Sequence, residues 1–301
     1  MRLLILFIFI LCSWVVNGQI VRTHPYYKPM VVTGCSDADA QKFIDSAGIT
    51  DQTQKDAICT LVRELKDSSL WNLMNAIYPF IGGTASTHKW NLKDPQNTDA
   101  AFRLVFNGTW SHSSTGATPN GASGTYANTY LIPNTTLTKN NTHQSYYSRT
   151  NDGNGISIGA MNVSGVTDTA MILACKTAGI YSHSDMYSDN AGATSGTGRA
   201  ITSANYNSAA FFIASRISST NHVLYRNATN IAQSSGTVSG QMPILPIYLG
   251  GFSGSVPSGY DNTDTKQVAF VTIGSGLTSD QVRALNTIVE KYNDALGRGV
   301  Q

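Results

Sequence analysis

Between residues 84 and 276 the chain alternates short apolar runs with clusters of turn-forming residues, and this pattern constrains the fold more than any other feature. Gly, Asn, Pro and Ser separate the runs, and no segment between them is long enough for a helix that joins parallel strands. Short strands joined by tight turns are typical of an antiparallel β-sandwich. The expected strands are Phe102–Phe106, Tyr126–Ile132, Ile156–Val163, Thr169–Cys175, Ala209–Ile217, His222–Arg226, Ile244–Leu249 and Gln267–Ile273.

Helical periodicity flanks this block on both sides. Over 37–83, apolar residues recur at three- and four-residue spacing in two helices, and the same spacing over 70–77 predicts a third helical turn. Over 277–301, Thr278 and Gln281 form a capping box and an apolar stripe follows them. We therefore expect a helical cap segment before the sandwich and a C-terminal helix packed on it.

The first 18 residues have the pattern of a signal peptide. Arg2 precedes an apolar run from Leu3 to Val16, which is shorter than the about 20 residues of a membrane span. Cleavage is expected after Gly18, and no later segment is apolar enough to span a membrane. The sequence thus predicts a secreted, extracellular or surface protein, on a cell or a virion. Residues 19–36 predict an extended N-terminal arm.

The cysteines allow one disulfide at most in the mature chain. Cys12 lies in the leader, which leaves Cys35, Cys59 and Cys175. A bridge between Cys35 and Cys59 would clamp the helical segment to its lead-in. Cys175 lies in an apolar run, so we expect it to be a buried free thiol.

Five stretches carry a resemblance to known proteins: AIYPFIGGTASTHKWNLKDP, STGATPNGASGTYANTYLIPN, YYSRTN, NATNIAQSSGTVSGQMPILPIYLGG and VAFVTIGSGLTSDQVRALNTIVEKYNDALGR. They are similar to a group of phage and prophage-associated proteins and secreted bacterial proteins, over about residues 37–298. The resemblance implies a concanavalin A-like (laminin-G-like) jelly-roll sandwich and a structural or adhesive role, often in a tail or head fibre. The leader departs from the phage pattern and favours a secreted or cell-surface relative.

The scarcity of charge bears on catalysis. Charged residues make up 13% of the chain and the net charge is +2, so there is no basic field for nucleic acid. Glycosidases on this kind of fold need two carboxyl groups, about 5 Å apart in retaining enzymes. Glu64 and Glu290 are the two glutamates, and both fall in expected helices. We predict a non-catalytic protein; the alternative is a secreted polysaccharide-active enzyme, a glycoside hydrolase or lyase. Ser157, in a G-x-S-x-G match, lacks the strand–turn–helix context of a nucleophile.

A polar stretch over 181–190 is the first candidate for ligand binding. We expect a surface loop in which aromatic rings stack on a sugar while carboxylates and an amide hold its hydroxyl groups or a Ca²⁺ ion. The residues proposed for sugar binding are Tyr181, Asp185, Tyr187, Asp189 and Asn190, and those for Ca²⁺ are Asp185 and Asp189. A solvated loop without a ligand is the alternative interpretation.

Trp110, with His112 and Tyr126 nearby, is a second and weaker candidate, because a Trp beside a strand more often belongs to the core. The partner expected from these features is a cell-surface or matrix glycan. Self-association through the arm is a further expectation, because extended arms can add to the sheet edge of a neighbour. Apart from Ca²⁺, no cofactor is expected.

Overall fold

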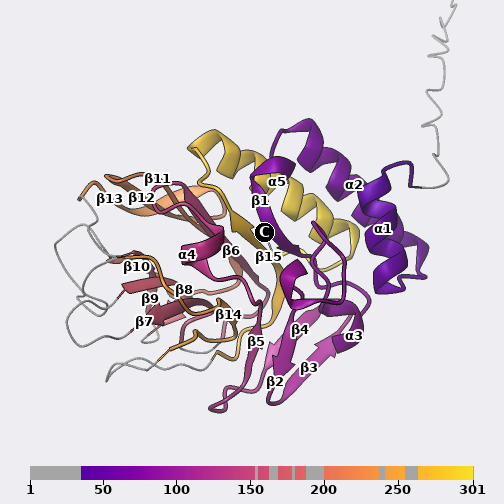
Figure 1. Ribbon diagram of the computed structural model, residues 1–301, viewed down its shortest axis with the longest axis horizontal. Coiled ribbons are helices and arrows are strands. Elements are labelled where there is room, and N and C mark those ends of the chain that lie inside the picture. The colour runs from indigo at the N-terminus through magenta and orange to yellow at the C-terminus, as the bar shows by residue number, and fades with distance from the viewer. Residues whose placement is uncertain are drawn as a thin grey trace, which may run out of the picture. The chain divides into compact units, whose positions relative to one another are not determined.

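The computed structural model describes residues 35–152, 155–162, 169–177, 180–187, 200–236, 241–254 and 264–300. The expected leader, and the expected arm up to residue 34, lie outside these ranges. Within them the chain forms two antiparallel sheets and a set of helices (Figure 1). The predicted fold class is confirmed: a mainly β, antiparallel sandwich with an N-terminal helical segment and a packed C-terminal helix.

The larger sheet has eight strands among the described residues. They run in the order β13-β12-β11-β6-β15-β4-β3, and β1 also pairs with β15. Their bounds are β1 Met74–Tyr78, β3 Trp110–Ser113, β4 Gly116–Pro119, β6 Thr142–Ser148, β11 Ala210–Ser218, β12 Asn221–Arg226, β13 Thr229–Ser234 and β15 Val268–Gly274.

The smaller sheet has seven described strands in the order β10-β9-β8-β7-β14-β5-β2. Their bounds are β2 Val105–Asn107, β5 Tyr126–Asn128, β7 Ile158–Asn162, β8 Thr169–Thr177, β9 Tyr181–Met186, β10 Ala200–Ala204 and β14 Tyr248–Leu249. The helices are α1 Ala38–Ala47, α2 Gln52–Asp67, α3 Ala85–His88, α4 Pro133–Thr136 and α5 Ser279–Ala295, with 3₁₀ turns η1 Trp71–Leu73 and η2 Asp99–Ala101.

The larger sheet is the middle layer of the described fold. Helices α1, α2 and α5 cover one of its faces, and the seven-stranded sheet packs on the other (Figure 1). In strand β11, successive side chains point alternately to the helices and to the smaller sheet. Phe211 and Ile213 belong to the core beneath the helices, whereas Phe212 and Ala214 belong to the core between the sheets.

The helical segment begins at a cap and is tied by a disulfide. Asp37 accepts hydrogen bonds from the backbone N–H groups of Asp39 and Ala40 at the start of α1. Cys35 and Cys59 form the bridge that the sequence allowed, and Cys175 is a buried free cysteine. The bridge fixes the chain entering α1 to the middle of α2.

Removing this disulfide should lower the free energy of unfolding by about 3 kcal/mol, because it closes a loop between residues 24 apart in sequence. A Cys35→Ser, Cys59→Ser double variant, unfolded in urea and followed by circular dichroism, measures the loss. Cys59→Ser alone should show the same loss, since either change opens the loop. An unchanged midpoint would contradict the expectation.

The C-terminal helix has the predicted start. Thr278 and Gln281 make both hydrogen bonds of the capping box at α5. Shortly after this helix ends, the guanidinium of Arg298 is fully buried among backbone carbonyl groups. The helix is therefore held at both ends, by its cap and by this arginine.

The third helical turn expected over 70–77 is confirmed only at its start, and the rest of that segment is a strand. A 3₁₀ turn over Trp71–Leu73 leads into β1, which pairs with β15. Ala76 faces the core between the sheets and Ile77 the core under the helices. A segment that is buried on both faces is apolar at most positions, so its spacing fits the period of a helix and that of a strand equally well. Spacing alone therefore cannot distinguish the two.

Several strands were missed because their residues are polar. Central strand β6 reads Thr-His-Gln-Ser-Tyr-Tyr-Ser and is buried along its whole length. On its helix-facing side, His143 Nε2 and Ser145 Oγ lie 2.9 and 2.6 Å from Thr272 Oγ1 on β15. Hydrogen bonds between buried side chains thus replace apolar contacts here. The other expected-loop segments that form strands are β3, β4, β9, β10 and β13.

In the described part of the chain, no helix has both the length and the apolar character needed to cross a membrane.

Candidate functional site

Two tyrosines from distant parts of the sequence stack on the outer face of the seven-stranded sheet. Strands β5 and β14 pair with Tyr248 opposite Asn128, while Ala127 and Leu249 point into the core between the sheets. The rings of Tyr126 and Tyr248 therefore stand on the opposite face, with centroids 4.1 Å apart and planes within 4° of parallel. Each ring therefore uses one of its two faces on the other.

Both rings are half-buried, and this has a chemical consequence. Burial first, and then the neighbouring Tyr126, raise the pKa of Tyr248 to about 12. The Tyr248 hydroxyl therefore remains neutral at physiological pH and can donate as well as accept a hydrogen bond.

A third tyrosine and an arginine extend this cluster. Tyr130 has a positive φ of 58°, and its backbone N–H donates to Asn128 Oδ1 at 2.8 Å, which holds the turn after β5. The guanidinium of Arg103 lies 5.9 Å from the Tyr130 ring centroid and pairs with Asp99 at 2.7 Å. We call Tyr126, Tyr130 and Tyr248 the tyrosine face.

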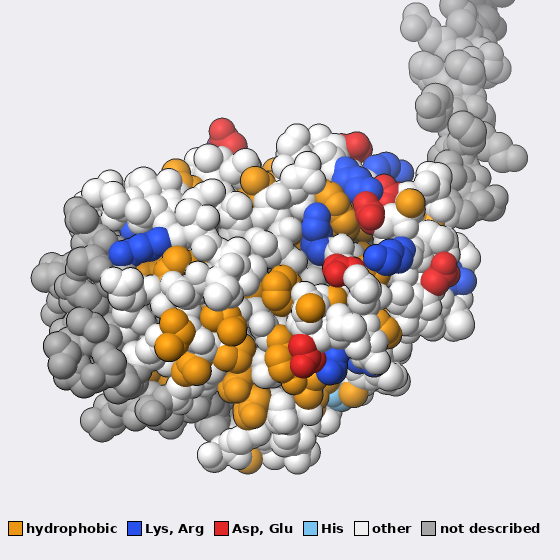
Figure 2. Space-filling view, in the orientation of Figure 1, with side chains coloured by type: hydrophobic (Ala, Val, Ile, Leu, Met, Phe, Trp, Pro, Cys, Tyr) orange, Lys and Arg blue, Asp and Glu red, His pale blue; other side chains and the backbone are white. Residues whose placement is uncertain are grey.

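An apolar margin borders the tyrosine face. The chain before β14 runs beside the chain after β5, because Ile247 N–H donates to Leu131 O and Asn134 N–H donates to Pro243 O. Ile244, in this margin, is 63% exposed and adds to the apolar surface. Figure 2 shows hydrophobic side chains gathered over the region of β5 and β14, on a surface that carries few charges.

The stretch over 181–190 is not a loop in its described part. Residues 181–186 form β9, between β8 and β10, so the expected loop is wrong there. Tyr181 is 40% exposed, but Asp185 is 1% and Tyr187 0% exposed. The Tyr187 ring lies in the core between the sheets and offers no face for stacking. The sequence pattern does not indicate this strand, because its buried positions hold Ser, His and Asp instead of apolar residues.

Asp189 and Asn190 lie outside the described residues. The Ca²⁺ hypothesis pairs Asp189 with Asp185, so it stays a prediction. Within the ranges described, no three His, Cys, Asp or Glu side chains gather in a way that could hold a metal ion.

Trp110 lies in β3, where it is partly buried against the core between the sheets. Its Nε1–H donates to Asn107 O at 3.1 Å, and an added Cβ at Gly250 would come within 2.9 Å of its ring. Phe106 packs edge-on against it, with ring centroids 5.3 Å apart. Trp110 therefore packs against the core, which was the alternative to a role in sugar binding. Tyr126, named beside it, belongs instead to the tyrosine face.

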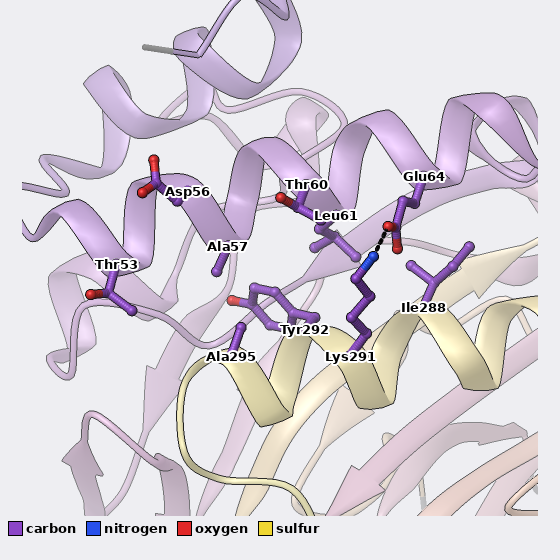
Figure 3. Close-up of a pocket in the computed structure, with 10 residues that line it drawn as sticks. All are labelled: Thr53, Asp56, Ala57, Thr60, Leu61, Glu64, Ile288, Lys291, Tyr292 and Ala295. Carbon is purple, nitrogen blue, oxygen red and sulfur yellow. Dashed lines mark hydrogen bonds and ion pairs between the residues drawn. The ribbon is translucent and has the colours of Figure 1, made fainter. Parts of the chain in front are cut away.

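A groove between α2 and α5 encloses about 280 Å³ (Figure 3). Glu64 from α2 reaches across it and pairs with Lys291 from α5. Asp56 and Thr53 lie nearer its other end, and Tyr292 forms part of its floor. The second glutamate, Glu290, accepts a hydrogen bond from the Tyr147 hydroxyl at 3.0 Å. Both glutamates lie on helices, as predicted, and each holds the helical layer in place.

Ser157 is fully buried just before β7, and its hydroxyl accepts a hydrogen bond from the backbone N–H of Cys175 at 3.3 Å. A strand follows it rather than a helix. It therefore lacks the sharp turn that exposes a nucleophilic serine.

Sequence comparison finds no matching family model and no matching curated protein. Among solved structures, the chain is similar to the CBM40 module of the Ruminococcus gnavus IT-sialidase bound to alpha2,3 sialyllactose. That match has a TM-score of 0.39 and 13% identity, and covers 61% of this chain and 95% of that one.

Two enzymes or enzyme domains are similar to a comparable degree. For Trypanosoma rangeli sialidase in complex with sialic acid, the TM-score is 0.44 at 12% identity, with 81% of this chain and 39% of that chain covered. For domain 4 of AbnA, a GH43 extracellular arabinanase from Geobacillus stearothermophilus, in complex with arabinotriose, it is 0.39 at 11% identity, with 71% and 98% covered. Such values carry no conclusion about activity or ligand.

Proposed function

We propose that this protein is a non-catalytic glycan-binding protein and that the tyrosine face binds the sugar. The parallel pair of Tyr126 and Tyr248 is the observation that carries the proposal. Its rings stand on the outer face of a sheet, they come from two strands held in register, and each keeps one face free of the other.

This geometry suits a sugar ring. A pyranose presents C–H groups on a flat face and hydroxyl groups around its edge, so it stacks on an aromatic face and hydrogen-bonds beside it. The neutral hydroxyl of Tyr248 can supply hydrogen bonds to sugar hydroxyls. Tyr130 and the exposed Ile244 add apolar area next to the pair. Because the rings rest on paired strands, little side-chain freedom is lost on binding.

A non-catalytic role is supported by the positions of the carboxylates around this face. Asp99, the acidic residue paired with Arg103 beside Tyr130, is already engaged in an ion pair. Glu64 and Glu290 are engaged by Lys291 and Tyr147 in the helical layer. A glycosidase mechanism needs two carboxyl groups flanking the bond to be cleaved.

The wider setting follows from the sequence and belongs to the proposal. The leader predicts a protein that acts outside the cell or on a cell or virion surface. There a glycan-binding sandwich would serve as an adhesive or structural subunit. A secreted polysaccharide-active enzyme is the rival function, and release of reducing sugar from polysaccharides that the protein binds would favour it.

A glycan array probed with the secreted chain tests the proposal, and the best binding glycan is then titrated by calorimetry. Replacing Tyr248 or Tyr126 with Ala should weaken binding about tenfold, because a stacked ring is lost. Tyr206→Ala is the matched control, since this tyrosine is 72% exposed and lies at the other end of the sheet, just after β10. It should leave affinity unchanged.

Two outcomes would contradict the proposal. A blank array with correctly folded protein would remove glycan binding. Binding that survives both tyrosine replacements would place the glycan elsewhere on the protein. Tyr248→Phe separates the two contributions of this side chain: it keeps the stacked ring and should lose only the part of the affinity that the hydroxyl supplies.

A further inference from the structure

Two fully buried polar side chains between the sheets have unpartnered atoms. Arg216 on β11 and Gln144 on β6 are both 0% exposed. Nε and Nη2 of Arg216 have no hydrogen-bond partner, and neither Oε1 nor Nε2 of Gln144 has one. Leaving such groups without partners in an interior costs several kcal/mol, so buried polar atoms are nearly always satisfied.

The sheet register places these two side chains on the same face. In the pairing of β11 with β6, Arg216 is opposite Thr142 and Ala214 is opposite Gln144. Ala214 belongs to the core between the sheets, and so do the side chains two residues away along each strand. Arg216 and Gln144 are therefore diagonal neighbours, a separation that long side chains bridge.

The walls around Arg216 are polar and already satisfied. Its Nη1 donates to the carbonyl oxygens of Ser218 and Ser219 at 3.1 and 3.0 Å, which fixes the guanidinium. From the opposite sheet, the Tyr187 hydroxyl donates to Thr142 Oγ1 at 3.1 Å. Ser184 Oγ lies 3.1 Å from His222 Nε2. None of these contacts uses the unpartnered atoms of Arg216 or Gln144.

The numbers of unpartnered donors and acceptors indicate which kind of ligand could form hydrogen bonds with them. Arg216 offers one hydrogen on Nε and two on Nη2, and the Gln144 amide offers two more against a single acceptor oxygen. A water molecule accepts two hydrogen bonds and can donate to Gln144 Oε1, but one water cannot accept from all of these donors. Asp185 lies within electrostatic reach of the guanidinium, but it bonds neither of the unpartnered nitrogens. Unpartnered donors on neighbouring side chains beside a fixed positive charge are the features of an anion site.

We propose that a small monovalent anion of the halide class binds between the two sheets, held by Arg216 Nε and Nη2 and by Gln144 Nε2. The anion accepts hydrogen bonds from the guanidinium and the amide inside the fold and stabilises the end of the sandwich at the β11–β12 hairpin. This inference is independent of the glycan proposal.

Bromide provides the direct test. Crystals of the secreted chain grown in sodium bromide should give an anomalous peak within hydrogen-bond reach of Arg216 and Gln144. A water molecule there, or no density, would overturn the proposal.

Stability in solution provides a second test, with chloride exchanged for gluconate at constant ionic strength. The melting temperature of the wild type should rise saturably with chloride, by roughly 5 °C. Arg216→Gln should abolish the rise, and Gln144→Leu should increase the half-saturating concentration about tenfold. Arg283→Gln, at an exposed arginine of α5, is the matched control and should keep the full response.

If Arg216→Gln does not fold, Gln144→Leu and the bromide map still decide the question. Equal melting curves of the wild type in chloride and gluconate would overturn the proposal.

Discussion

Between pH 7.5 and pH 5 the free energy of unfolding should fall by about 6 kcal/mol, because burial strongly lowers the pKa of three histidines in the fold. Burial, which comes first in each case, lowers the pKa of His88 to about 3 and the pKa of His143 and His183 to about 4. In the unfolded chain these rings titrate near 6.5. Below that pH the unfolded state binds protons that the folded state rejects, so stability is lost as the pH falls from about 6.5 towards 4.

His143 shows why the folded state rejects the proton. Its Nδ1 must donate to Ser275 O, 2.5 Å away, because a carbonyl oxygen only accepts. Its Nε2 lies 2.9 Å from Thr272 Oγ1, within the buried hydroxyl network of β6 and β15. A second proton would place a charge in a region with no exposed surface. Each of the three histidines contributes about 2 kcal/mol to the loss by pH 5.

Urea unfolding at pH values from 7.5 to 5 measures this effect, in a range where Asp and Glu stay largely ionised. A His143→Asn variant should start less stable and lose about a third of the pH dependence, since one of three titrating rings is gone. Arg283→Gln, at an exposed arginine of α5, is the control and should keep the full pH dependence. A free energy of unfolding that stays flat over this range would contradict the expectation.

The same buried polar groups explain how much of the fold the sequence could predict. The sandwich, the capped helix α5 and strands such as β8, β11 and β15 follow from apolar runs and cap residues. Strands β6 and β9 do not, because their buried positions hold His, Gln, Ser and Asp. Such residues are stable inside only when their partners are present, and those partners come from strands distant in sequence. Thr272, for example, lies 129 residues from His143.

The candidate site was predictable only in part for a related reason. Tyr126 could be named as a weak candidate, but its partner Tyr248 lies on a two-residue strand after a Pro-containing turn. No local pattern links the two positions; the pairing of β5 with β14 does. The polar stretch beginning at Tyr181 is typical of an exposed loop, but in this protein many polar side chains are buried, among them Ser182, Ser184 and Asp185.

Replacing Arg298 with Met should lower the free energy of unfolding by about 4 kcal/mol. The guanidinium joins four parts of the fold that are far apart in the sequence. Nη2 donates to Pro79 O and Ala269 O at 2.7 and 3.1 Å, and Nη1 to Phe80 O at 2.6 Å and Ser114 O at 3.3 Å. Nε donates to Asn293 Oδ1 at 2.9 Å, near the end of α5.

Met fills much of the same space but leaves these carbonyl groups buried without donors, and unpartnered buried acceptors are costly. Arg298→Lys should recover less than half of the loss, because an ammonium group cannot reproduce the planar fork of five N–H donors. Arg283→Met, at the exposed surface of α5, should change stability by less than about 0.5 kcal/mol and controls for charge. Chemical unfolding of the three variants ranks them. If Arg298→Met matched Arg283→Met, α5 would be held by its apolar stripe alone, and the buried arginine would not anchor the helical layer to the sandwich.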